Sequence, residues 1–341
     1  MEKNITNKRI DELDYIRGFA LLGIILVNIL ALLNIKTPDP GTIDASYQRF
    51  LYLFVEGRFF SIFSFLFGVG FYIFITRAIA KGKNGYVLFL RRLVALFVFG
   101  VIHQMFQPGE ALAIYAVCGL ITLPFYKVNK RINLVIGLIL TIVIGIFGGK
   151  TLLPIPLILL GLAAGQYRVF ENIREKTTQV AVFTAIMFIL SAIGLWYQYQ
   201  QVPALPFDNV ILGGVDDPNM EQANMFMTIG VMVGPIVSAF YVGLLILLLQ
   251  TKLVQTLLVP LKYYGRMALT NYVGQTAMIL IAGSMFNFTG NLTYVQTLYV
   301  CIVIYAIQIV FSIIWMKFFK MGPFEWIWRV VTYWTVTPLK K

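Results

Sequence analysis

Long apolar runs, separated by short clusters of charged and polar residues, follow one another along almost the whole chain. The runs are continuous over about 20 residues, the length of a helix that crosses a bilayer. They do not alternate apolar and polar positions as membrane β-strands do. We therefore predict about ten transmembrane helices, placed by the charge clusters between them. They cover residues 13–33, 58–77, 87–105, 110–126, 131–148, 151–168, 178–199, 223–250, 266–286 and 294–317.

These helices leave no stretch for a separate soluble domain, so we predict one all-α, polytopic transmembrane domain over residues 1–341. The run at 13–33 follows three carboxylates and lacks a small-residue cleavage pattern, so it is the first span rather than a cleaved signal peptide. Two longer connections, 34–57 and 200–222, contain prolines and acidic residues. We expect solvated loops there, with caps over an outward-facing cavity as the alternative.

Composition agrees with a chain that lives in a bilayer: 59% of its residues are hydrophobic, 12% are charged and the mean hydropathy is +0.81. With the N-terminus inside, all but four of the 27 Lys and Arg residues fall on the inner side. The four outer ones are Lys36, Arg49, Arg58 and Lys150. This asymmetry predicts that both termini are cytoplasmic. Because the basic residues are spread over every inner connection, a nucleic-acid surface is not expected despite the net charge of +12.

The residues after the last span form a different pattern, in which Gly322 and Pro323 end the helix and tryptophans and tyrosines follow. Glu325 and Arg329 are spaced as an i, i+4 pair. The pattern predicts an amphipathic helix near 323–334 that lies in the inner headgroup layer, where indole rings settle favourably.

His103 is the only histidine, and it lies at the outer end of the third predicted span. Glu110 follows seven residues later, and Pro108 and Gly109 impose a turn between the two. A carboxylate that contacts the imidazole would orient it as a general base for a hydroxyl or an amine, worth about 10² to 10⁴ in rate. The alternative is a histidine that only ties two helices together.

Asp14 and Arg17 lie one helical turn apart where the first span begins. The pair either anchors this helix or holds Arg17 toward an inner cavity, where its guanidinium would bind an anionic group. Three further inner cations share that choice between anion binding and plain topology: Arg91, Arg92 and Arg266.

Other polar residues in the spans have two open interpretations. Arg58, an outer cation at the start of the second span, is a candidate for binding an anionic acceptor. Asn271 and Gln275 are stacked at i and i+4 in the ninth span. Buried amides in lipid must find partners, so these two either bond across helices or line a wet cavity. No Cys, His or carboxylate spacing typical of a metal site occurs, so we expect no bound metal.

Several blocks in order along the chain resemble the YeiB-type family of bacterial multi-pass membrane proteins, also described as domain of unknown function 418. The blocks are LDYIRGFALLGIILVNI at 13–29, FFSIFSFLFGVGF at 59–71, RRLVALFVFGVIH at 91–103, GEALAIYAVCGL at 109–120, GRMALTNYVGQ at 265–275 and GPFEWIWR at 322–329. The resemblance implies a bacterial plasma-membrane protein. After the histidine span the family commonly has Gly-Asp-Ile-Leu, where this chain has a glutamate at position 110.

Through the LDxxRG pattern the family is more distantly similar to transmembrane acyltransferases, in which a membrane histidine is often central. This similarity implies acyl-coenzyme A as a co-substrate, held by Arg17 and the other inner cations, and a small-molecule, lipid or glycan acceptor activated by His103 and Glu110. Two alternatives stay open. One is a small-solute transporter or exporter, and the other is a non-enzymatic envelope assembly factor. The path of the transporter would include Asp14, Arg17, Asn271 and Glu110. A homo-oligomer is compatible with each of them.

Overall fold

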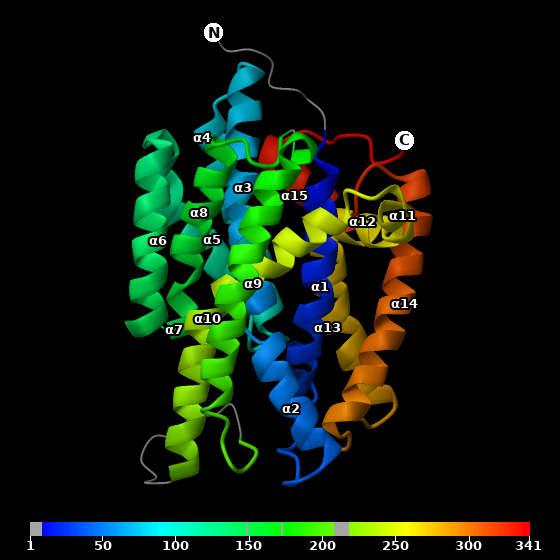
Figure 1. Cartoon of the computed structure of the whole chain (residues 1–341). Helices are drawn as coiled ribbons and strands as arrows, with labels where there is room; N and C mark the ends of the chain where they lie inside the picture. Colours follow the sequence, from blue (N-terminus) through cyan, green and yellow to red (C-terminus); the bar gives the residue numbers. More distant parts are fainter. Residues whose placement is uncertain (1–8, 148, 172, 208–217) are drawn as a thin grey trace.

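The structure is a computed structural model that describes residues 9–147, 149–171, 173–207 and 218–341. Within these residues the regular secondary structure is helical, apart from an isolated bridge between Phe319 and Lys340. One helix corresponds to each predicted span: α1 (Asp11–Leu32), α3 (Arg58–Ala80), α4 (Gly85–Gln104), α5 (Leu112–Thr122), α6 (Lys130–Phe147), α8 (Pro154–Gln166), α9 (Thr177–Tyr199), α10 (Pro218–Leu248), α13 (Ala268–Met285) and α14 (Tyr294–Phe318). The predicted all-α class is confirmed (Figure 1).

In the part of the chain that the structure describes, eight helical stretches are long and apolar enough to cross a membrane. Of the ten predicted spans, α5 and α13 are outside this set. The apolar helix that begins with α5 is shorter, and the 18 residues of α13 include polar ones such as Asn271 and Gln275. Both helices pack among the others, so the polytopic bundle is confirmed, with two of its members shorter or more polar than a typical span.

The connection 34–57, expected to be a solvated loop, contains a helix instead, α2 (Ile43–Phe54). The hydroxyl of Thr42 accepts the N–H of Ala45 at 3.2 Å and caps its first turn. Leu51 and its neighbours on one face of α2 are buried in the bundle, which repays the cost of ordering the segment. In the other long connection, residues 208–217 lie outside the described residues.

Shorter helices complete the fold: α7 (Gly149–Leu152), α11 (Lys252–Leu257), α12 (Val259–Arg266), α15 (Pro323–Tyr333) and the 3₁₀ helices η1 (Leu123–Lys127) and η2 (Ile173–Lys176). The helix expected near 323–334 is α15, which packs against α4 and α13. The expected pairing of Glu325 with Arg329 is wrong. Glu325 instead accepts the backbone N–H groups of Leu269 and Thr270 at 2.7 and 3.1 Å, and so caps the start of α13.

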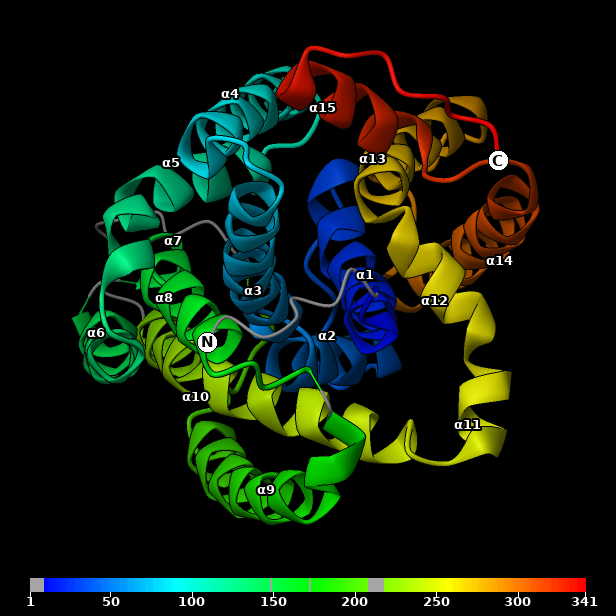
Figure 2. The ribbon, with the colours of Figure 1, turned by 90° about the horizontal axis from the view of Figure 1, so that it is seen from above.

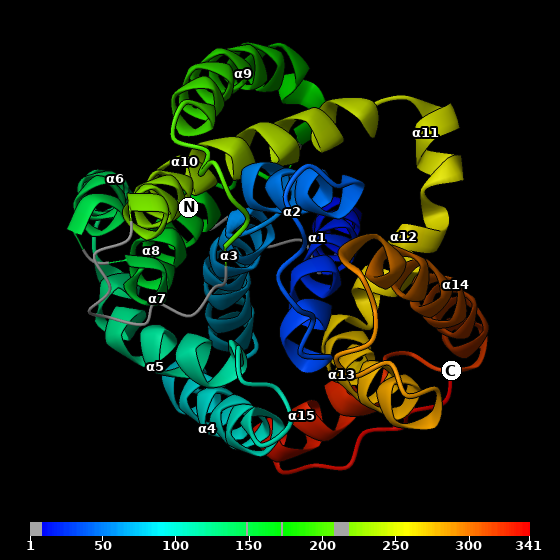
Figure 3. The same cartoon turned by 90° about the horizontal axis from the view of Figure 1, so that it is seen from below.

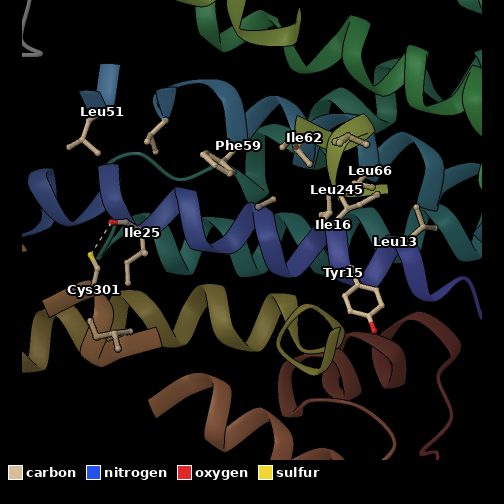
Figure 4. Packing of buried hydrophobic residues seen from close by; sticks show 14 of the residues in the cluster. Leu13, Tyr15, Ile16, Ile25, Leu51, Phe59, Ile62, Leu66, Leu245 and Cys301 are labelled. Carbon is tan, nitrogen blue, oxygen red and sulfur yellow. Dashed lines mark hydrogen bonds between the residues drawn. The ribbon is translucent and has the colours of Figure 1, made fainter. Parts of the chain in front are cut away.

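The helices α1 and α3 lie inside a ring of the others, seen from either end of the bundle (Figures 2 and 3). Buried apolar side chains of α1, such as Ile16 and Ile25, pack there against α2, α3, α10 and α14 (Figure 4). The outermost helix is α9, which packs on α10 and exposes large apolar side chains such as Phe188 and Trp196. An exposed apolar helix of this kind is expected on the lipid-facing side of a membrane protein.

Two glycines bring α1 and α12 into close contact at the end where the chain begins. Gly18 on α1 lies against the backbone carbonyl of Leu261, and Gly265 on α12 lies against that of Asp14. A Cβ atom at either position would overlap the opposing backbone, so only glycine permits this approach. The contact brings the end of α12, where Arg266 follows Gly265, close to Asp14 on α1.

The C-terminus of the chain lies at the end of the bundle near α15 (Figure 1), and Arg9 lines the same cavity as Arg329 and Tyr333 of that helix. A chain with an even number of membrane crossings has both termini on the same side, as the charge asymmetry predicted. That this end faces the cytoplasm stays a prediction from the positive-inside rule.

Candidate functional site

The side chains of His103 and Glu110 meet, as the turn between them led us to expect. His103 is the penultimate residue of α4, and Glu110 lies just before α5. The Nδ1 atom of the imidazole contacts Oε2 of the carboxylate, and the N–H of Leu112 donates to Oε1. Gly100 lies against the backbone of Ala113, so α4 and α5 approach closely enough for the contact. The roles of the two residues stay predictions.

A third side chain, not singled out from the sequence, completes this cluster. The hydroxyl oxygen of Thr276 on α13 lies 2.9 Å from Nε2 of His103. The ring of Tyr272, one turn earlier on α13, stands edge-on to the imidazole, with the ring centroids 5.1 Å apart. His103, Glu110 and Thr276 are all buried.

The cluster is enclosed by protein. His103 lies at the end of α4, as expected, and its side chain is 5% exposed. Its partner Thr276 lies about 12 Å along α13 from Ala268, close to the middle of that helix. The turn between α4 and the 11-residue α5 therefore packs against the middle of α13.

A cavity of about 420 Å³ leads from the end of the bundle near α15 to this cluster. At its inner end it is lined by Ala111, Leu112, Tyr115 and Tyr272, which adjoin Glu110 and His103 in sequence or in space. Its middle is aromatic and aliphatic, with Phe67 and Phe71 among its walls. The His103 and Glu110 side chains themselves lie behind this lining.

A second cavity of about 490 Å³ adjoins the first at the same end of the bundle. The residues that line both cavities are Arg9, Arg17, Gly70, Phe74, Arg92, Arg329 and Tyr333. Further cations line only one of them: Arg77, Lys81, Lys83, Arg266 and Lys320. Among the described lining residues the carboxylates are Asp14 and Glu325. This large excess of positive charge favours a ligand that carries several negative charges.

The predicted pair of Asp14 and Arg17 is present and larger than expected. Nη1 of Arg17 lies 3.1 Å from the Asp14 carboxylate, which also accepts two hydrogen bonds from Arg9 at 2.5 and 2.9 Å. Burial alone would lower the pKa of Arg9, but the hydrogen bond and charge of Asp14 outweigh it and raise that pKa. Asp14 is thus shared by two cations, Arg9 and Arg17, and both of them line the two cavities.

The structure separates the other candidate cations. Arg92 lines both cavities and stacks on Trp328, with its guanidinium carbon 3.6 Å from the ring centroid. Arg266 lines the first cavity, and its buried Nε has no hydrogen-bond partner. Burial, together with the nearby Arg9 cation, lowers the pKa of Arg266. Arg91 lines neither cavity and stacks on Trp334 instead.

The structure does not bring Arg58 to either cavity. Its side chain is 1% exposed, and its guanidinium donates to the carbonyls of Glu56 and Gly230 and to Oε1 of Gln198. An outer anionic acceptor therefore has no access to Arg58 in this conformation. The cation joins α3, α9 and α10 instead.

Of the two interpretations for Asn271 and Gln275, bonding across helices is the one observed. Asn271 donates to the carbonyl of Tyr264 and to the hydroxyl of Ser312, and Gln275 donates to the hydroxyl of Tyr264. Neither residue lines a described cavity. Asn271, one of the four residues expected along the path of a transporter, therefore lines neither cavity.

Sequence reasoning missed Thr276 and most of the basic residues around the cavities. The charge asymmetry had placed Arg77, Lys81, Lys83 and Lys320 on the inner side, but not around one cavity. Thr276 directly follows Gln275 in a helix rich in polar residues, which was the available signal. In the described residues, no three His, Cys, Asp or Glu side chains gather as a metal site would need.

Comparison with known proteins connects this site to two families. Residues 164–335 match the sequence model described as protein of unknown function (DUF418). Residues 9–215 match that of the heparan-alpha-glucosaminide N-acetyltransferase catalytic domain. The second match contains α1, α3, His103 and Glu110, and it indicates a fold similar to that of transmembrane acyltransferases.

Individual relatives cover nearly the whole chain. An uncharacterized 39.9 kDa protein from the amylase 3' region of Bacillus acidopullulyticus is 57% identical over 98% of this chain and 96% of its own length. YxaH of Bacillus subtilis is 27% identical over 100% and 98% of the two chains. YeiB of Escherichia coli is 27% identical over 97% of each. The resemblance found in the sequence blocks is confirmed.

Proposed function

From the premise that this chain belongs to the DUF418 family and shares a fold similar to that of transmembrane acyltransferases, we propose that it is itself such an enzyme. It takes an acyl group from acyl-coenzyme A on the cytoplasmic side of a bacterial plasma membrane. It transfers that group to a small-molecule, lipid or glycan acceptor on the other side.

The observation that carries this proposal is the first cavity, with cations at one end and the His103–Glu110 pair behind the other. Coenzyme A has phosphate groups at one end and its thioester at the other, so the two ends of such a donor match the two ends of this cavity. The volume of about 420 Å³ is within the range of small-molecule sites. Guanidinium groups suit the phosphates because they donate two parallel hydrogen bonds to a planar or tetrahedral anion.

The buried pair supplies the chemistry that the reaction needs. An attacking hydroxyl or amine must lose a proton as it adds to the thioester carbonyl, and a neutral imidazole accepts that proton. The carboxylate of Glu110 holds the ring in one orientation and stabilises the imidazolium that forms. The apolar walls of the cavity exclude water, which otherwise competes with the acceptor for the acyl group.

The proposal is tested by donor binding and by transfer. We expect purified protein in detergent to bind coenzyme A and acyl-coenzyme A saturably. Membranes that contain the protein should transfer a radiolabelled acyl group from acyl-coenzyme A to an extractable, non-protein product. His103→Ala should reduce this transfer by about 100-fold or more and leave coenzyme A binding unchanged.

Gln104→Ala is the matched control, since Gln104 is the exposed neighbour of His103 on the same helix. It should transfer normally. Normal transfer by His103→Ala would reject the assigned chemistry, and absence of coenzyme A binding to the unaltered protein would reject the acyltransferase altogether.

A further inference from the structure

Both nitrogens of the His103 ring are engaged by protein groups. Glu110 uses one carboxylate oxygen to accept the Leu112 N–H, and its other oxygen contacts Nδ1. With Glu110 as a carboxylate, both of its oxygens are acceptors, and Nδ1 then carries the ring proton in this network. Nε2 is then the acceptor, and the hydroxyl of Thr276 at 2.9 Å donates to it. The group that the imidazole activates in this arrangement is therefore the Thr276 hydroxyl.

We propose that Thr276 is the nucleophile that carries the acyl group between donor and acceptor, an inference that rests on the proposed acyltransferase function. A nucleophile within hydrogen-bond reach of a base, with that base oriented by a third group, is the arrangement that activates hydroxyls in covalent catalysis. Thr276, His103 and Glu110 supply these three parts in order, from α13, α4 and the turn before α5. Sequence position does not define such a set, since geometry and roles do.

The hydrogen bonding of Thr276 differs from that of three threonines inside α6, α9 and α15. Thr141, Thr184 and Thr332 each donate to the carbonyl four residues earlier, at 2.7 Å. That local bond is the ordinary way for a helical threonine to satisfy its hydroxyl. Thr276 instead bonds to an imidazole on another helix. Its hydroxyl is thus held toward the base rather than toward its own backbone.

The place of Thr276 in the bundle suits a group that receives an acyl chain from the first cavity. Tyr272, which lines the inner end of that cavity, is four residues before Thr276 and so lies on the same face of α13. The Thr276 hydroxyl is one helical turn beyond Tyr272, whose ring both lines the cavity and contacts the His103 imidazole. An acyl chain that enters displaces this ring to bring its carbonyl to the hydroxyl.

The two steps balance without any further reactant. In the first, Oγ1 of Thr276 attacks the thioester carbonyl, and Nε2 of His103 takes the hydroxyl proton. The carbon–sulfur bond then breaks, and coenzyme A leaves as a thiol with that proton. In the second, His103 takes a proton from the acceptor hydroxyl or amine, which attacks the threonine ester. The ester bond breaks, the acyl group is on the acceptor, and the proton returns to Thr276.

The test is an exchange reaction that needs no acceptor. Purified protein is incubated with acetyl-, butanoyl- or palmitoyl-coenzyme A and radiolabelled free coenzyme A, and label in the acyl-coenzyme A pool is measured. Exchange requires the acyl group to remain on the protein when coenzyme A leaves. We expect exchange with at least one donor, and a mass increase of one acyl group on the peptide that contains Thr276.

Two variants and a control separate the hydroxyl from the shape of the side chain. Thr276→Ser keeps the hydroxyl and should exchange, whereas the isosteric Thr276→Val should lose exchange by about 100-fold or more while binding coenzyme A normally. Thr141→Val removes a threonine hydroxyl on α6 and should leave exchange unchanged.

The outcomes also distinguish this inference from the function on which it rests. If Thr276→Val exchanges normally, another group carries the acyl chain and the inference is overturned. If the unaltered protein binds donor and transfers to an acceptor without exchange, transfer is direct, so the inference fails and the proposed function stands. If the unaltered protein binds no acyl-coenzyme A, both fail.

Discussion

Adjacent arginines on α4 offer a direct test of the basic cavities. Arg92 lines both cavities and stacks on Trp328, whereas Arg91 lines neither and stacks on Trp334. The two guanidinium carbons lie 3.6 and 3.9 Å from their ring centroids, and both side chains are half-buried. Replacing either by Leu removes one cation and its stacking on a tryptophan, and Arg92 also has a longer contact of 5.0 Å with the Phe74 ring. The pair of variants therefore differs mainly in access to the cavities.

The magnitude follows from what each position contributes. Loss of a cation–π contact with a tryptophan costs each variant about 0.5 to 2 kcal/mol of stability. Only Arg92→Leu also removes a charge-assisted hydrogen bond to a bound phosphate, worth about 1.5 to 3 kcal/mol. That range corresponds to about a 10- to 150-fold rise in Kd for coenzyme A. Some residues of the cavity lining, such as Arg9 and Lys83, are exposed, so solvent screens the charges there. We therefore expect a rise in Kd in the lower part of this range, about 10- to 30-fold.

The assay is equilibrium binding of radiolabelled coenzyme A to purified protein in detergent, at about physiological ionic strength. We expect Arg91→Leu to bind as the unaltered protein does, and Arg92→Lys, which keeps the charge but not the fork of donors, to fall between. Equal Kd values for Arg92→Leu and Arg91→Leu, within about twofold, would refute the assignment of these cavities to a phosphorylated donor.

Three further predictions concern the cavity, the α15 contact and the α1–α12 contact. Gly70 lines both cavities, and a Cβ there would meet only Nη2 of Arg17 at 3.8 Å, so Gly70→Leu should fold. Its side chain should fill the space and weaken coenzyme A binding by about 10-fold or more, and unchanged binding would contradict this. Burial raises the pKa of Glu325 despite its hydrogen bonds with Thr270, so the folded protein protonates this group more readily than the unfolded chain does. The contribution of protonated Glu325 to stability is complete below its pKa in the unfolded chain. It is lost as pH rises through the higher pKa of Glu325 in the folded protein. Between about pH 4 and 7 the Tm of Glu325→Gln should therefore fall less with rising pH than the Tm of the unaltered protein. Identical slopes of Tm against pH would count against the buried carboxyl. Gly265→Ala should lower the free energy of unfolding by about 1 to 3 kcal/mol because its methyl group overlaps the α1 backbone. Gly145→Ala, where a Cβ has ordinary contact distances, should be tolerated. Equal Tm values for the two variants would argue against close packing between α1 and α12.

Local signals were sufficient for the helices and for one contact of the site. The length of the apolar runs was sufficient to predict a helix at every span. A segment that crosses the hydrocarbon layer must form all of its backbone hydrogen bonds internally, and a helix does so. Pro108 and Gly109 impose a short turn, so the meeting of His103 and Glu110 followed from adjacency along the chain. Helix α2 was missed because its one buried face is stabilised by neighbours distant in sequence, which no local pattern contains.

The sequence by itself therefore determined the class of protein, the helix order and the pairing of groups within a turn of one another. Only the tertiary structure decided which cations converge, since Arg91 and Arg92 are neighbours in sequence yet face different surroundings. It also brought Thr276 to the imidazole from 173 residues away, where helical spacing has no bearing. The physical reason is that a helix fixes the directions of its own side chains, while packing between helices fixes which of those directions meet.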